Sequence, residues 1–119
     1  MAAVADQIVI RASEPTTFDR AAVAAVDDDG WIVGRATLSP LYGLRAEIQL
    51  ELASSDAVAI ALIDALEQEA CRRRLMRLEL AARSVSRAVA GALWHTRPVS
   101  DARRRDVPYL TWPTTQSSS

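Results

Sequence analysis

A strand–helix–strand pattern across residues 45–82 constrains the fold of this chain more than any other feature. Residues 45–52 alternate between apolar and polar side chains in AEIQLEL, as in a half-buried strand. Apolar residues then recur at helical spacing, which predicts a helix over residues 56–74. A short connection leads to a strand at residues 75–82, so we expect a right-handed crossover between two parallel strands.

The two ends of this predicted helix complement its dipole. Ser54 and Ser55 precede Asp56 at the positive end, and three arginines at residues 72–74 lie at the negative end. The arginine triplet therefore needs no nucleic-acid partner, and the net charge of −1 provides no general basic field. We expect no nucleic-acid binding. Cys71 is expected to be a small buried residue, with a reactive thiolate as the alternative.

The rest of the chain adds antiparallel elements around this unit. The further elements that we expect are strands at residues 6–12, 18–26, 31–38 and 107–112 and a helix at residues 84–95. Asp29-Gly30 lies between two apolar runs and predicts a tight hairpin. The order β-β-β-β-α-β-α-β predicts an α+β fold, in which a mostly antiparallel sheet carries two main helices.

The C-terminal region suggests a surface for pairing. Residues 100–106 are polar and rich in arginine, so we expect an exposed loop. Residues 107–112 contain one proline and are followed by another, which favours a strand at the edge of the sheet. Tyr109 and Trp112 on such an edge predict a homodimer through it. The alternative is that both rings complete the core.

Length and composition exclude several classes of protein. A chain of 119 residues is typical of one domain, which we expect at residues 1–113, followed by a polar disordered tail at residues 114–119. No apolar run approaches the ~18 residues that cross a bilayer. With a single cysteine and no leader-like start, we expect a cytoplasmic location. The acidic turn at residues 27–29 lacks the rest of a calcium loop, so we expect no metal.

The strings VAAVDDDGWIVGRATL, AEIQLEL and LIDALEQEACRRRLMRLEL together resemble the GNAT superfamily of acyl-CoA-dependent N-acyltransferases, over residues 18–94. The resemblance implies that the strands at residues 45–52 and 75–82 splay apart around the pantetheine arm of acetyl-CoA or another acyl-CoA. It also implies a small amine or a protein amine as acceptor, with Glu47 or Glu51 as the general base.

The resemblance further implies a loop whose backbone amides bind the CoA pyrophosphate at the start of the helix. The residues that it assigns to this loop are Leu52, Ala53, Ser54, Ser55, Ala57 and Val58. The family's loop carries glycines and a basic or amide residue, whereas this loop has neither glycine nor arginine and includes Asp56. Trp94 stands where the family commonly has a tyrosine. These departures leave a second interpretation open, a degenerate non-catalytic module for binding, regulation or dimerisation.

Overall fold

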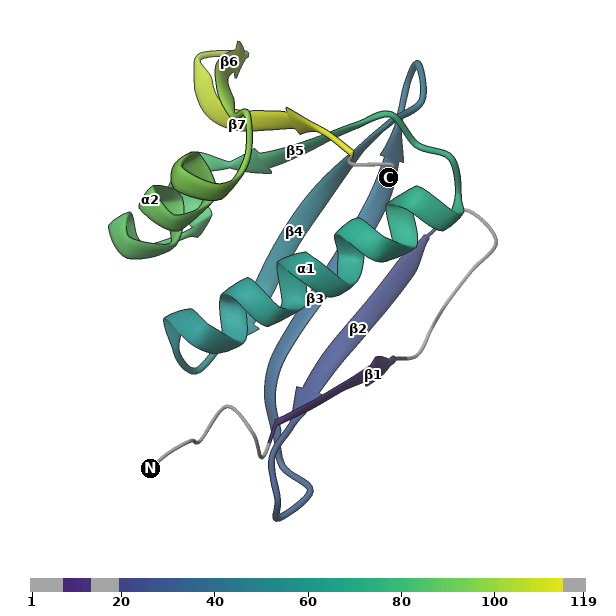
Figure 1. Ribbon diagram of the computed structural model, residues 1–119, viewed down its shortest axis with the longest axis vertical. Helices are drawn as coiled ribbons and strands as arrows, with labels where there is room; N and C mark the ends of the chain where they lie inside the picture. The colour runs from purple at the N-terminus through teal and green to yellow at the C-terminus, as the bar shows by residue number, and fades with distance from the viewer. Residues whose placement is uncertain (1–7, 14–19, 115–119) are drawn as a thin grey trace.

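The computed structural model describes residues 8–13 and 20–114, which form one seven-stranded sheet and two long helices (Figure 1). The strand order is β1-β2-β3-β4-β5-β7-β6, and every neighbouring pair is antiparallel except β4–β5. The elements are β1 (Val9–Ala12), β2 (Ala21–Val26), β3 (Ile32–Leu41), β4 (Arg45–Ala53), α1 (Asp56–Arg72), β5 (Arg77–Ala81), the 3-10 helix η2 (Ala82–Ser84), α2 (Arg87–Thr96), β6 (Ser100–Arg104) and β7 (Val107–Pro113). The predicted α+β class with a mostly antiparallel sheet is confirmed.

The acidic turn between β2 and β3 forms the predicted hairpin. The carboxylate oxygen Oδ1 of Asp27 accepts hydrogen bonds from the amides of Asp29 and Trp31, at 2.9 and 3.0 Å. Gly30 takes a φ of 85°, which glycine adopts without the cost that a Cβ atom imposes. The aspartate side chain therefore organises the turn.

The core joins alanines of β2, β3 and β4 to large side chains from both the strands and the helices, among them Trp112 and Leu66. Helix α1 crosses the sheet over β2, β3 and β4 (Figure 1). Its N-terminal half lies directly against Gly34, where a Cβ atom would come within 2.6 Å of Val58 Cγ1 and 2.9 Å of Leu62 Cδ1. A glycine at this position of β3 thus sets how closely the start of α1 approaches the sheet.

Helix α1 begins at Asp56 as predicted and ends two residues earlier than predicted. Ser55 is its N-cap, and Ser55 Oγ accepts a hydrogen bond from the amide of Val58 at 3.2 Å. At the other end Arg74 takes a positive φ of 61°, and the amide of Leu75 donates to the carbonyl of Ala70. The left-handed residue stops the helix and directs the chain into β5.

The predicted loop at residues 100–106 is wrong, because residues 100–104 form strand β6. The strand is an edge of the sheet and pairs only with β7, so its polar side chains stay exposed and no apolar alternation is required. Arg105 and Asp106 turn the chain back with positive φ angles of 52° and 66°. A turn of this kind usually contains glycine or asparagine, which is why the sequence did not indicate a hairpin.

The predicted edge position of residues 107–112 is also wrong, because β7 lies between β5 and β6. Both neighbours pair with Tyr109, Leu110 and Thr111, whereas Pro108 pairs only with β6 and Pro113 only with β5. The prolines therefore flank the doubly paired segment, so their missing amides are compatible with an interior strand. The expected homodimer through this strand has no exposed edge to use.

Three further expectations concern the ends of the described segments. Thr114, expected to begin the tail, is buried instead, and its Oγ1 donates to the carbonyl of Leu75 at 2.6 Å. Residues 115–119 of the expected tail, and residues 6, 7, 18 and 19 of the expected strands, lie outside the described residues.

Within the described part of the chain, neither helix is long and apolar enough to cross a membrane.

Candidate functional site

Strands β4 and β5 part in the middle of β4. Their parallel ladder runs from the pair Arg45–Arg77 to the pair Ile48–Leu80. Beyond Ile48, β4 continues to Ala53 while paired with β3 alone, and β5 ends at Ala81. The two strands diverge from this point (Figure 1), which confirms the expected splay. Among the described residues, the diverging half of β4 therefore has one backbone edge without a neighbouring strand.

A groove of about 370 Å³ lies where the strands diverge. One wall is the end of β4 and the start of α1, and the other wall is formed by Ser84, Val85, Ser86 and Val89. Of the expected loop residues, the groove is lined by Leu52, Ala53, Ser54 and Ser55, whereas Ala57 and Val58 do not line it. Val58 is buried under β3 instead.

The N-termini of both long helices meet at this groove. Ser86 is the N-cap of α2, and its Oγ accepts a hydrogen bond from the amide of Val89 at 3.1 Å. The same hydroxyl donates to Asp56 Oδ1 at 2.9 Å, so a carboxylate on the first residue of α1 is bonded to the cap of α2. Within the described residues, the amides of Asp56 and Ala57 have no hydrogen-bond acceptor.

Ser86 was missed as a site residue because the sequence placed it inside a predicted helix that began at residue 84. Its position three residues before Val89, at the start of the apolar stripe, is the signal of an N-cap. The contact with Asp56 joins residues 30 apart in the chain and depends on the placement of the two helices.

Two carboxylates lie side by side next to the point of divergence. Glu47 of β4 and Glu79 of β5 are paired residues in the parallel ladder, so their side chains point to the same face of the sheet. Glu79 is 4% exposed, and its Oε2 accepts a hydrogen bond from Arg45 Nη1 at 2.8 Å. The sequence did not single out Glu79, although a parallel register would have placed the polar residue of LMRLELAA beside a polar residue of β4.

Arg104 of β6 places a second positive charge beside these two carboxylates. Its Nη2 lies 2.9 Å from Glu79 Oε1 and 3.6 Å from Glu47 Oε1, and its guanidinium lies 4.4 Å from the centre of the Tyr109 ring. Glu79 Oε1 accepts no well-directed hydrogen bond from any described residue, so this contact is an ion pair alone. Two arginines thus face two carboxylates.

Glu51 has different surroundings from Glu47. It is the extra residue at a β-bulge, where the register of β4 against β3 shifts. Its Oε1 accepts a hydrogen bond from Arg35 Nε at 3.0 Å, and its side chain is 45% exposed and lines the groove. The structure therefore separates the two expected bases, with Glu47 beside the ladder and Glu51 on the groove wall.

The groove fits one part of an acyl-CoA and not the other. The open edge of β4 offers backbone groups to the amides of a pantetheine arm, and Leu50, Val85 and Val89 add apolar contacts to a lining that is otherwise mostly polar. The start of α1 is unfavourable for the pyrophosphate, because Asp56 adds negative charge there. None of the described residues that line the groove is basic.

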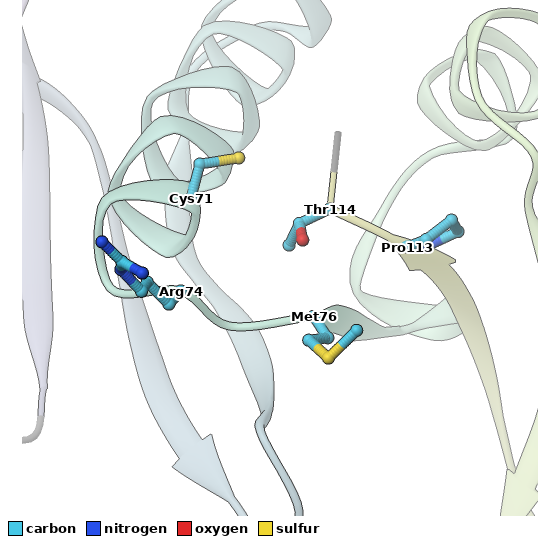
Figure 2. A pocket seen from close by; sticks show the side chains of 5 residues that line it. All are labelled: Cys71, Arg74, Met76, Pro113 and Thr114. Atoms are coloured by element: carbon cyan, nitrogen blue, oxygen red, sulfur yellow. The ribbon is translucent and has the colours of Figure 1, made fainter. Parts of the chain in front are cut away.

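A second cavity, of about 570 Å³, lies at the far end of α1 (Figure 2). It is lined by Cys71, Arg74, Met76, Pro113 and Thr114. Cys71 is only partly buried here, although the sequence favoured a buried position. None of the described residues that line the cavity is a carboxylate, and the cavity lies at the opposite helix end from the groove, so it does not belong to the same site. Trp94 is 46% exposed on α2 and does not line the groove either.

Comparisons with known proteins agree on the fold. No family model matches the sequence, and no curated protein matches it. A Klebsiella pneumoniae protein assigned as an acyl-CoA N-acyltransferase aligns with a TM-score of 0.70 at 15% identity, over 91% of this chain and 98% of its own. A GNAT-family acetyltransferase of Staphylococcus aureus gives 0.63 at 11% identity, over 82% and 69% of the two chains.

A third solved structure is a complex with coenzyme A. The PaiA N-acetyltransferase of Thermoplasma acidophilum, in complex with coenzyme A, aligns with a TM-score of 0.61 at 16% identity, over 80% of this chain and 61% of its own. At these identities the likeness defines the fold alone. The chain has the GNAT fold.

Proposed function

We propose that this chain is an N-acyltransferase that holds the arm of an acyl thioester in the groove between β4 and β5. The observation that carries the proposal is the end of the parallel ladder at the pair Ile48–Leu80, while β4 runs on to Ala53. Such an edge can bind an extended, amide-bearing chain as a further strand would bind. The GNAT fold, which the chain shares with acetyltransferases, supports the same assignment.

An acyl-CoA, such as acetyl-CoA, supplies an acyl group activated as a thioester. The backbone of residues 49–53 would orient its arm, and Leu50, Val85 and Val89 would keep water away from it. Leu50 lines the groove two residues beyond Ile48, where the ladder of β4 and β5 ends. The thioester carbon would lie near this point, within reach of groups on the face of the sheet away from α1.

Glu47 is the general base in this proposal, and Glu51 is the alternative. Glu47 precedes the last pair of the ladder, and its side chain is 17% exposed on the face away from α1. The carboxylate would take a proton from the acceptor amine as its nitrogen attacks the thioester carbon. The C–N bond forms, the C–S bond breaks, and the departing thiolate takes a proton from a water molecule. That water recovers a proton from the Glu47 carboxyl group, which returns to its ionised form. Small amines and protein amines both meet this requirement.

The test measures acylated product by mass spectrometry, with S-acetylpantetheine and acetyl-CoA as donors. Spermidine and a short peptide with a free α-amine serve as acceptors. We expect turnover above the solvent reaction, and an about 100-fold lower kcat in Glu47→Gln if Glu47 is the base. Glu51→Gln is the matched variant, and a loss there in place of Glu47→Gln would move the role to Glu51. Unchanged kcat in both variants would remove both residues from catalysis.

A non-catalytic binding module is the second candidate. It is favoured by one observation, the Asp56 carboxylate that lies at the start of α1 and is bonded to Ser86. Hydrogen exchange separates the two candidates, because a bound arm should slow exchange in residues 49–53. Unchanged exchange with both donors, together with no product, would favour the binding module.

A further inference from the structure

The mouth of the groove already contains an anion of the protein itself. Asp56 is the first residue of the 17-residue helix α1, and its Oδ1 accepts a hydrogen bond at 2.9 Å from Ser86, the N-cap of the 10-residue helix α2. The N-termini of two helices, each with a partial positive charge, therefore face one carboxylate. The position that would best attract a phosphate is filled from within the chain.

We propose that Asp56 selects the donor, so that the groove accepts a pantetheine thioester without a pyrophosphate in preference to an acyl-CoA. The proposal rests on the proposed function, since it concerns the same groove. It assigns a specificity role to a residue that touches neither the acyl group nor the acceptor.

The charges around the mouth support this assignment. Asp56 forms no ion pair with any described residue. Glu51 is the other charged residue that lines the groove, and its charge is balanced by Arg35. A diphosphate would therefore meet the negative charge of Asp56 at the mouth, whereas an uncharged pantetheine arm would not.

The hydrogen bonds at the start of α1 support it as well. Ser55 Oγ already accepts from the amide of Val58, so this hydroxyl is directed to the helix end. The amide of Ala59 donates to the carbonyl of Ser55. The amides of Ser55, Asp56 and Ala57 are left for a ligand among the described residues of this turn, and all three lie within one residue of Asp56. An anion bound to these amides would be repelled by the negative charge of the Asp56 carboxylate.

The experiment compares three donors of increasing charge by calorimetric titration. They are S-acetylpantetheine, which is uncharged, S-acetyl-4′-phosphopantetheine, which carries the single phosphate found on carrier-protein arms, and acetyl-CoA. For the unmodified chain we expect acetyl-CoA to bind at least about tenfold more weakly than S-acetylpantetheine. We expect the affinity for S-acetyl-4′-phosphopantetheine to lie between those for the other two donors.

Asp56→Asn tests the role of the charge, because the amide oxygen can still accept from Ser86. We expect this variant to bind acetyl-CoA about tenfold more tightly and S-acetylpantetheine with unchanged affinity. Asp28→Asn removes the same charge from an exposed turn and should change neither affinity. Far-UV circular dichroism of both variants checks that they are folded.

Two results would overturn the proposal, and they are distinguishable. If the unmodified chain prefers acetyl-CoA, or if Asp56→Asn leaves its affinity unchanged, Asp56 does not select the donor, while the acyltransferase assignment stands. If none of the three thioesters binds to either protein, the acyltransferase assignment fails and the donor selection fails with it.

Discussion

At the scale of single residues, the β6–β7 turn contains strained backbone. Arg105 and Asp106 both have positive φ angles, 52° and 66°, without the freedom of glycine. Non-glycine residues in this region are strained by roughly 1 kcal/mol each. The turn nevertheless forms, because β6 is paired with β7 along its whole length.

The strain predicts that Asp106→Gly stabilises the protein. We expect the free energy of unfolding to rise by about 0.5–1 kcal/mol, measured by urea denaturation, because glycine adopts this φ without a clash. Asp28→Gly is the matched control in the β2–β3 turn, where φ is not positive. This control should lose stability, since glycine there adds freedom to the unfolded chain only. An equal effect of both substitutions would contradict the explanation.

The same scale shows what the sequence could indicate about the site. Glu47, Glu51 and the serines before α1 could be predicted from the sequence, because strand alternation and helix capping are local patterns. Glu79 and Ser86 were not, because each becomes relevant through a partner more than 29 residues away, Glu47 and Asp56 respectively. A register between strands and a contact between helix ends are tertiary facts that local periodicity does not contain.

At the scale of elements, the two ends of α1 differ in what holds them. The first turn is capped by Ser55, whereas the last turn is held by Glu69, which pairs with both Arg72 and Arg73. Hydrogen bonds from Arg72 and then from Arg73 lower the pKa of the Glu69 carboxyl below its usual value of 4.5. Folding therefore favours the ionised form of this side chain.

The lowered pKa predicts a pH-dependent effect of Glu69→Gln. The ion pairs stabilise the folded state fully above the unfolded pKa, and their contribution is lost as pH falls through the lower folded value. We expect the variant to be about 0.5 kcal/mol less stable than the parent at pH 7, the typical size for partly exposed pairs. The difference should shrink at acid pH and at about 1 M salt, both measured by urea denaturation. A difference that is constant with pH would exclude the ion pairs as its cause.

The strands show where sequence patterns succeed and where they fail. The strand β4 and the helix after it were predicted, because each buries one face and so carries a period of two or of 3.6 residues. Strand β6 was missed, because an exposed edge buries neither face and its sequence SDARR has no period. Strand β7 was predicted, but its position in the sheet was wrong. A proline removes only one backbone hydrogen-bond donor, and the pairing of the sheet decides whether the missing donor faces β5 or β6.

At the scale of the whole molecule, the divergence of β4 and β5 does not divide the protein into two units. One core cluster includes residues from β2, β3 and β4 and also from β5, α2 and β7. Helix α1 is the shared element. Its Glu67 Oε2 accepts from Trp112 Nε1 of β7 at 2.7 Å and from Arg97 Nε at 2.6 Å, just beyond α2. The groove between β4 and β5 therefore lies in a molecule whose two halves share one hydrophobic core through α1.

This continuity predicts that the two halves unfold together. Trp112 is fully buried in the C-terminal half, whereas Trp31 and Trp94 are 71% and 46% exposed, so a Trp31→Phe/Trp94→Phe variant makes Trp112 the sole fluorescent indole. We expect its urea transition to coincide with that of the far-UV circular dichroism, which α1 dominates. Adding Arg97→Met should lower both midpoints equally, because the lost contacts join α2 to α1. An earlier transition of Trp112 than of the helix signal would instead mean that the groove is a boundary between two independently folding parts.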